Sequence, residues 1–391
     1  MAKKVIIVGG GPAGLFCAYL LLKKNYQVDL YDHSSGLAKK FLIAGNGGLN
    51  LTHSEDLKPF SQKYIGNENL FYELINEFSP SDLRGFCDDL GVETFIGTSG
   101  RVFPKKLKAG EILLKWTKIL KENSNFNLYL KHSLIDMDSN KTLSFSSAAG
   151  EVKTQADTVI LATGGASWKK TGSDGKWCEI IQSLGIEIED FRAMNCGFEV
   201  SWSEHLKKRV ERSHLKNIEL SILGHKSRGE AMITPYGIEG GVVYALSKFI
   251  QDKIQDEGSA SVNIDLKPDL SDQEIEAKLQ KRKLKDSLSN HLRKSLKLDK
   301  ASIALLYENS LNITAKNIKC LPIKLERPRP IDEAISTSGG VKFSELTKNF
   351  ESKAVPGLYF AGEMLDFDAP TGGYLLQGCF STASRVVKGL K

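Results

Sequence analysis

The hydrophobic pattern at the start of the chain predicts a strand, a turn, a helix and a second strand. Residues 3–8 form a short β-branched run that ends at glycine, which is typical of a buried β-strand. Residues 15–24 fit a helix, and residues 27–31 fit a second buried strand that ends at Asp32. The order therefore predicts a βαβ unit with a parallel sheet.

Three glycines stand in the turn between the first strand and the helix, in the spacing G-x-G-x-x-G. Gly9 permits the tight turn, Gly11 lacks the Cβ that would strike a pyrophosphate, and Gly14 lets the helix pack closely on the strand. The helix N-terminus offers free N–H groups to phosphates. Asp32 would accept hydrogen bonds from ribose hydroxyls. A glycine-rich turn without a ligand is the alternative, but the flanking strands, helix and acid favour a dinucleotide site.

Later segments favour FAD over NAD. Residues 39–52 join two lysines to a glycine-rich loop that bears amide side chains, which can neutralise phosphates and approach a flat ligand. Residues 156–165 and 355–363 predict two more strands that return to the carboxyl edge of the sheet. Residues 372–377 open the C-terminal helix, whose amides suit the negative charge of a reduced flavin. Taken singly, the loop also fits a surface segment and the first of these strands fits any α/β protein.

The middle of the chain has a different pattern. Residues 197–202, 218–222 and 261–266 alternate apolar and polar side chains, which predicts antiparallel strands with one face in water. Pro328 and Pro330 favour extended chain, and we expect the chain to return there to the first domain. The pattern predicts a discontinuous dinucleotide-binding domain with an insertion.

Residues 269–300 are charged and predict a helical segment, opened by a capping box at Ser271. Basic residues gather in residues 278–297, which fits either a solvated helix face or an anionic partner. The net charge of the whole chain is only +6, so we expect no nucleic-acid partner.

Composition places the 391-residue chain among ordinary globular proteins, with 41% hydrophobic and 26% charged residues. Its six cysteines include no CxxC and no close pair, which predicts no zinc site or disulfide framework and favours a reducing cytoplasm. Residues 5–22 carry no charge, but Gly9 to Gly14 interrupt them, so neither a membrane span nor a signal peptide is expected.

Several motifs together resemble one family of bacterial FAD-binding flavoproteins, known as BaiN-like or aminoacetone oxidase proteins. The matching segments are residues 41–54, 100–104, 164–168, 195–198, 237–241, 338–341 and 361–366. The resemblance implies a glutathione-reductase-like Rossmann FAD domain, an inserted antiparallel β-rich domain and a small helical domain. The expected bounds are residues 1–190 with 331–391, residues 191–268 with 316–330, and residues 269–315.

The sequence departs from this family at two places. Many relatives have Gly-Arg-Lys where this chain has Ala38, Lys39 and Lys40, so a bidentate arginine is replaced by the point charge of a lysine. Many also have Gly-Gly-Arg-Cys-Asn around residues 47–50. The chain thus belongs to a distinct branch, and the substrates of better studied relatives do not transfer to it.

The motifs and the resemblance give one set of predicted FAD-binding residues, with the cofactor held non-covalently. The set is Gly9, Gly11, Pro12, Ala13, Gly14, Asp32, Lys39, Lys40, Asn46, Gly47, Gly48, Asn50, Leu134, Ala162, Thr163, Gly164, Gly362, Glu363, Asp366, Gly372, Gly373, Tyr374 and Leu375.

We expect an FAD-dependent oxidoreductase that transfers hydride between the flavin and a small organic substrate. His53, Arg101 and Tyr374 are weak catalytic candidates, and Cys379 fits a buried thiol better than a flavin linkage. A second G-x-G-x-x-G is missing, so NAD(P)H is at most a transient electron donor. The seven histidines have no metal spacing, and no metal is expected. The alternatives are a flavin-binding module without turnover and an RNA-linked flavoprotein; the oligomer is a monomer or a homodimer.

Overall fold

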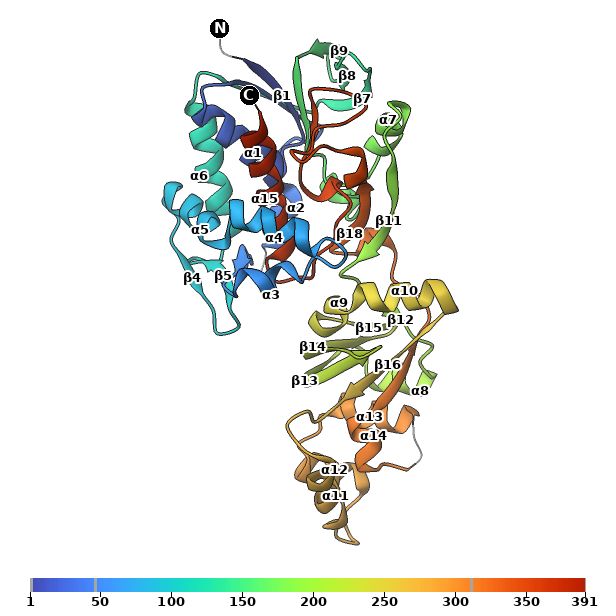
Figure 1. The fold of residues 1–391 in the computed structure, drawn as a ribbon. Helices are drawn as coiled ribbons and strands as arrows, with labels where there is room; N and C mark the ends of the chain where they lie inside the picture. Colours follow the sequence, from blue (N-terminus) through green and yellow to red (C-terminus); the bar gives the residue numbers. More distant parts are fainter. Residues whose placement is uncertain (1–2, 46–47, 310–311, 391) are drawn as a thin grey trace. The chain divides into compact units, whose positions relative to one another are not determined.

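The computed structural model describes residues 3–45, 48–309 and 312–390, so the predicted site residues Asn46 and Gly47 lie outside it. The chain divides into two compact units (Figure 1). Unit 1 comprises Met1–Arg192 and Ser336–Lys391, and unit 2 comprises Ala193–Ile335. Unit 1 is therefore built from both ends of the chain. A separate domain at residues 269–315 stays a prediction.

A parallel sheet of five strands forms the centre of unit 1, in the order β19-β10-β1-β2-β6. Its side chains are largely buried on both faces, as expected for the β-branched runs in the sequence. The C-terminal strand pairs with β10, which pairs with β1, so the sheet joins the two ends of the chain. The strands are β1 (Lys4–Val8), β2 (Gln27–Asp32), β6 (Phe126–Leu130), β10 (Thr158–Leu161) and β19 (Leu358–Phe360).

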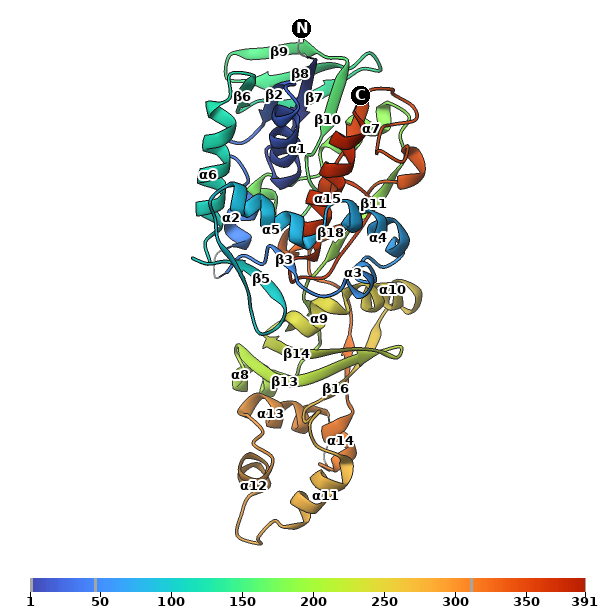
Figure 2. The same cartoon turned by 60° about the vertical axis from the view of Figure 1, so that its left-hand side comes forward.

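Helices α1 and α15 pack against each other in unit 1 (Figure 2). The ring of Phe16 on α1 lies 4.9 Å from the ring of Phe380 on α15, and both are buried. Such aromatic packing fixes the two helices at one distance. The helices of unit 1 are α1 (Pro12–Lys23), α2 (Lys39–Ala44), α3 (Leu57–Ser61), α4 (Glu68–Glu77), α5 (Pro80–Asp89), α6 (Ala109–Glu122), α7 (Trp177–Ser183) and α15 (Tyr374–Gly389).

Three smaller sheets complete this part of the chain. Two of them are antiparallel and three-stranded, with the orders β3-β5-β4 and β7-β8-β9, and the third pairs β11 with β18. Their strands are β3 (Thr52–His53), β4 (Thr94–Ile96), β5 (Arg101–Pro104), β7 (Ser133–Met137), β8 (Thr142–Ser147), β9 (Gly150–Gln155), β11 (Ile188–Met194) and β18 (Ser336–Val341).

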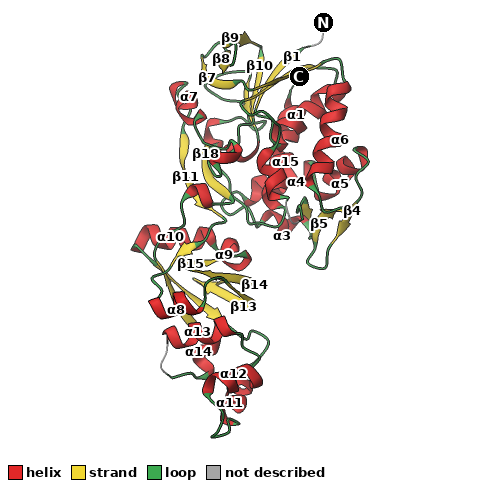
Figure 3. Cartoon of the chain, turned by 180° about the vertical axis from the view of Figure 1, so that it is seen from behind, coloured by secondary structure: helices red, strands yellow, loops and turns green. Residues whose placement is uncertain are grey.

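Unit 2 contains a six-stranded sheet in the order β12-β15-β14-β13-β16-β17, in which neighbouring strands are antiparallel. The strands are β12 (Phe198–Glu199), β13 (Ser213–Ile222), β14 (His225–Thr234), β15 (Gly237–Glu239), β16 (Ala260–Asp265) and β17 (Leu321–Leu325). Figure 3 shows the helices of this unit. They are α8 (Glu204–Arg209), α9 (Gly241–Ala245), α10 (Ser247–Glu257), α11 (Asp272–Gln280), α12 (Leu288–Ser295), α13 (Lys300–Asn309) and α14 (Ala315–Lys319).

The fold confirms the predicted Rossmann-type parallel sheet with antiparallel additions, but some elements differ from their predicted bounds. The first helix begins at Pro12 instead of Leu15, because proline is well tolerated in a first helical turn. The predicted helical segment at residues 269–300 is broken after Gln280, and Ser287 caps a new helix, α12. Among the described residues, no helix is long and apolar enough to cross a membrane.

Candidate functional site

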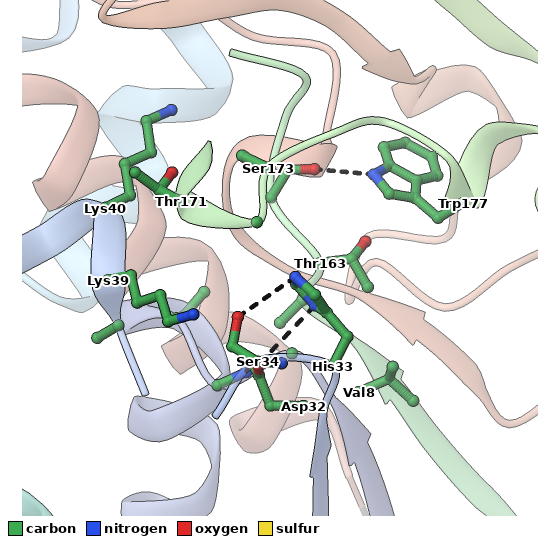
Figure 4. A pocket seen from close by; sticks show the side chains of 18 of the residues that line it. Val8, Asp32, His33, Ser34, Lys39, Lys40, Thr163, Thr171, Ser173 and Trp177 are labelled. Atoms are coloured by element: carbon green, nitrogen blue, oxygen red, sulfur yellow. Dashed lines mark hydrogen bonds and ion pairs between the residues drawn. The ribbon is translucent and has the colours of Figure 1, made fainter. Parts of the chain in front are cut away.

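A cavity of about 410 Å³ lies in unit 1, at the carboxyl ends of the five parallel strands. Its wall includes a residue at the end of each strand or within two positions after it: Val8, Asp32, His132, Ala162 and Ala361. Figure 4 shows side chains around this cavity, with Asp32, Lys40 and Thr163 among those labelled. In open α/β sheets, ligands bind at this edge.

Each of the three motif glycines is suited to its position for a different geometric reason. A Cβ on Gly9 would lie 2.3 Å from the carbonyl oxygen of Ala162, and a Cβ on Gly14 would lie 1.9 Å from the carbonyl oxygen of Gly9. Only glycine therefore fits at these two positions, because a Cβ would overlap the backbone. A Cβ on Gly11 would meet no atom within 4 Å, and Gly11 lines the cavity. The space beside Gly11 is thus open to a ligand, as the dinucleotide motif requires.

The N-terminus of α1 faces the same cavity through Gly11, Pro12 and Ala13. No side chain caps this helix, and its first turn contains no acidic residue. Its free N–H groups and the positive end of the helix dipole therefore suit a phosphate group. The cavity fits the pyrophosphate of a dinucleotide at this point.

Asp32 ends β2 and is 8% exposed. One carboxylate oxygen accepts the N–H of Gly10 at 2.6 Å, and the other accepts the N–H of Ser34 at 2.7 Å. Each oxygen can accept a second hydrogen bond. The carboxylate is thus fixed in place and can still receive ribose hydroxyls.

Lys40 and Glu363 form an ion pair in the wall of the cavity. The Nζ atom of Lys40 lies 2.9 Å from Oε2 of Glu363 and 2.8 Å from Oγ of Ser167. The side chain of Glu363 is 9% exposed, so its charge is largely removed from water and needs this partner. The ion pair joins the N-terminal and C-terminal segments of unit 1.

The predicted cofactor residues divide into three groups. Those that line the cavity are Gly9, Gly11, Pro12, Ala13, Asp32, Lys39, Lys40, Leu134, Ala162, Thr163, Gly164 and Glu363. Those that are described but lie outside its lining are Gly14, Gly48, Asn50, Gly362, Asp366, Gly372, Gly373, Tyr374 and Leu375. Asn46 and Gly47 lie outside the described residues.

The three catalytic candidates lie together at the N-terminus of α15. The hydroxyl of Tyr374 donates to Glu55 at 2.5 Å, and the rings of His53 and Tyr374 lie 5.4 Å apart. Arg101 pairs with His53 in the register of β3 and β5. Burial, followed by the hydrogen bond to Glu55 and its charge, raises the pKa of Tyr374, which Arg101 opposes. Tyr374 therefore stays protonated at neutral pH.

His53 makes two hydrogen bonds that define its tautomer. Its Nδ1 atom accepts the N–H of Glu55 at 3.2 Å, and its Nε2 atom lies 2.9 Å from the carbonyl oxygen of Ser99. The proton of a neutral ring therefore sits on Nε2. These bonds hold the His53 ring between Glu55 and Ser99.

Two buried polar atoms near these residues have no partner among the described residues: Oδ1 of Asn50 and Oγ1 of Thr52. Thr52 packs on the glycine turn before α15, where a Cβ on Gly373 would lie 2.5 Å from the Cα of Thr52. Buried polar atoms are normally hydrogen-bonded. Neither residue lines the cavity described above.

Sequence reasoning missed one wall of the cavity, which residues 171–177 and the turn after β2 form together. A Cβ on Gly172 would lie 2.4 Å from Nε2 of His33, so the two segments touch. The indole of Trp177 donates to the carbonyl of Gly164 at 3.0 Å. Cys379 also lines the cavity, and burial raises the pKa of its thiol to about 12. The glycines at 172 and 175 were the only local hint of this contact.

No group of three or more histidine, cysteine or acidic side chains in the described ranges is arranged to hold a metal ion.

Known proteins resemble this chain over nearly its whole length. The family described as HI0933-like protein Rossmann domain matches residues 3–389. The 3-dehydro-bile acid delta(4,6)-reductase of Clostridium scindens is 24% identical, over 97% of this chain and 97% of its own. The ribosomal RNA dihydrouridine synthase of Haemophilus influenzae is 25% identical, over 97% of this chain and 96% of its own.

Solved structures show the same fold at lower identity. The 3-ketosteroid-Δ4-(5α)-dehydrogenase of Rhodococcus jostii RHA1, in complex with 4-androstene-3,17-dione, gives a TM-score of 0.53. The two proteins are 16% identical, and the similarity covers 100% of this chain and 97% of that one.

Proposed function

Because the chain belongs to the HI0933-like Rossmann family of FAD-binding flavoproteins, we propose that it reduces a carbon–carbon double bond conjugated with a carbonyl group. The observation that carries the cofactor assignment is the open space beside Gly11, at the uncapped N-terminus of α1. FAD, when bound, supplies the hydride.

Four groups would hold the cofactor. The amides at the start of α1 would bind the pyrophosphate, and Asp32 would accept ribose hydroxyls. Lys40, already paired with Glu363, would place a positive charge beside the cavity. The glycine turn at Gly372 and Gly373 lies outside the cavity lining, and we propose that its amides at the start of α15 would form a second part of the site.

The reaction class is supported by the names of the two curated relatives. One name describes a delta(4,6)-reductase of a 3-dehydro-bile acid, and the other a synthase of dihydrouridine. Both reactions add two hydrogens to a double bond that is conjugated with a carbonyl group. In such a reduction a hydride is added to the β-carbon and a proton to the α-carbon, so the protein must supply a proton donor.

Tyr374 is the proposed proton donor. Its hydroxyl is held by Glu55, and its raised pKa keeps the proton on Oη until a substrate accepts it. The positive charge of Arg101 opposes the effect of Glu55 and would stabilise the tyrosinate that remains after transfer. Glu55, which sequence reasoning missed, is then a positioning residue.

An anaerobic experiment tests this function. The FAD-loaded protein is reduced with NADPH, NADH or dithionite and then mixed with a 3-keto-4-ene steroid, a simple cyclic enone or uridine. We expect at least one of these acceptors to reoxidise the flavin with stoichiometric formation of the saturated product. Reoxidation by oxygen alone, with no acceptor turned over, would instead support a binding module or an oxidase.

A further inference from the structure

Positive charge in this protein is concentrated in one short stretch of unit 2. Residues 278–300 contain nine lysine and arginine residues but two acidic residues, which gives this stretch a formal charge of +7. The formal charge of the whole chain is +6, so all other residues together carry −1. The small net charge of the whole chain therefore does not reveal that residues 278–300 are strongly basic.

The centre of this stretch is the loop between α11 and α12, the two helices labelled at that end of unit 2 in Figure 1. It exposes the side chains of Lys281, Arg282, Lys283 and Lys285, which we call the basic loop. Within the described residues, no carboxylate pairs with any of these four side chains. Exposed lysines elsewhere do have such partners: Lys105 pairs with Glu93 at 2.5 Å, and Lys226 pairs with Glu219 at 2.8 Å.

The basic loop is held at both ends by side-chain hydrogen bonds. The buried ring of His291 on α12 bonds through Nε2 to the carbonyl oxygen of Lys278 on α11, at 2.9 Å. Ser287 caps α12 by accepting the N–H of Asn290. Within the loop, the N–H of Asp286 donates to the carbonyl of Lys283 at 2.9 Å. These bonds tie the loop to both helices and limit its conformations, which lowers the entropy cost of binding a ligand.

We propose that the basic loop binds the phosphodiester backbone of a nucleic acid, through charge and without reading base sequence. A row of lysine and arginine side chains without internal counter-charges is the electrostatic footprint of phosphate-backbone binding. A membrane surface fits less well, because Leu284 is the one large apolar side chain that this loop exposes. Interfacial membrane binding needs a continuous apolar face. The proposal goes beyond the redox function and does not depend on it.

Salt-dependent binding tests the proposal on the full-length, FAD-loaded protein. Fluorescein-labelled RNA stem–loop and duplex DNA are titrated at several salt concentrations, with phosphatidylserine vesicles as a third probe. The variant K281Q/R282Q/K283Q/K285Q should bind the preferred polymer about tenfold or more weakly at low salt. The magnitude of the slope of log K against log salt should fall by about 3 to 4, since four phosphate contacts are lost.

A matched control has the same change in charge elsewhere. K58Q/K118Q/K121Q/K153Q neutralises four exposed lysines of unit 1 and should bind like the wild type, with the same salt slope. A second variant, Leu284→Ser, should leave both the affinity and the salt slope unchanged, because the proposed binding depends on charge.

The outcomes separate clearly. Binding by RNA or DNA that requires the basic loop supports the proposal, and the tighter polymer identifies the source of the backbone. Equal loss in both charge variants, or no loss in either, would overturn it. So would vesicle binding in the absence of nucleic-acid binding. Flavin absorbance and circular dichroism of each variant show that the fold is intact, and they keep a failure here separate from a failure of the proposed reductase.

Discussion

The Nζ atom of Lys40 lies 2.9 Å from Oε2 of Glu363, although 323 positions separate the two residues in the sequence. Lys40 lies on α2, near the start of the chain, and Glu363 follows the last strand of the central sheet. The ion pair therefore joins segments from the two ends of the chain at the cavity wall. This meeting explains why a site begun by the first βα turn is completed only after residue 360.

The ion pair should contribute to folding as well as to the site. Lys40→Gln leaves the mostly buried carboxylate of Glu363 without its partner, so we expect a loss of about 1–3 kcal/mol in the free energy of unfolding. The double variant Lys40→Gln/Glu363→Gln should recover part of this loss. Urea unfolding of the two single variants and the double variant measures the coupling energy; a coupling of zero would contradict a structural role for the pair.

Gly11→Val should abolish retention of FAD while the protein still folds. The Cβ at this position meets no protein atom, so the added side chain enters only the space that the pyrophosphate requires. Gly85→Val is a matched control, because a Cβ on Gly85 also meets no atom within 4 Å and Gly85 does not line the cavity. Absorbance of the purified proteins decides the matter: a Gly11→Val variant that stays yellow would remove this turn from the cofactor site.

Asp32→Ala should weaken FAD binding by about 1–3 kcal/mol, through the loss of hydrogen bonds to ribose. Asp29 provides the control, since it lies on the same strand, is also buried and pairs with Lys4 at 2.8 Å outside the cavity. Asp29→Ala should lower stability but leave the affinity for FAD unchanged. Fluorescence titration of each apoprotein with FAD separates the two effects, and equal affinities in both variants would count against Asp32 as a ribose ligand.

The role of Tyr374 predicts a characteristic pH dependence. Its pKa lies above the ordinary value of about 10, so the donor loses its proton, and the rate falls, only at a pH above that value. Glu55→Gln replaces a charged acceptor by a neutral one and so weakens both effects that raise this pKa, and the alkaline limb should move to lower pH. Tyr374→Phe should lower the rate of acceptor reduction by about 10²–10⁴ while the flavin is retained. The pH–rate profiles of the wild type and Glu55→Gln provide the check, and an unshifted alkaline limb would exclude Tyr374 as the donor.

Sequence patterns predicted the parts of this fold that are encoded locally. The spacing of Gly9, Gly11 and Gly14 with Asp32 defines one continuous βα turn and strand, and the structure places these residues together because they are neighbours in the chain. The Rossmann-type sheet, the antiparallel insertion and the membership of a flavoprotein family are confirmed.

The remaining parts depend on contacts between distant segments. No local sequence pattern predicts the close contact between Gly172 and His33. The same holds for the hydrogen bond from Tyr374 to Glu55. The break between α11 and α12 arises from a cap at Ser287 inside a stretch whose composition favours helix. The concentration of charge beside that break was visible in the sequence, but an average over the whole chain conceals it.

The central claim is that both ends of the chain build one FAD site at the carboxyl edge of the parallel sheet. A crystal structure of the protein purified with FAD tests it most directly. We predict density for the pyrophosphate within hydrogen-bond distance of the N–H groups of Gly11 and Ala13, with a ribose on Asp32. Flavin density away from this cavity, or a cavity that stays empty in crystals grown with excess FAD, would contradict the account.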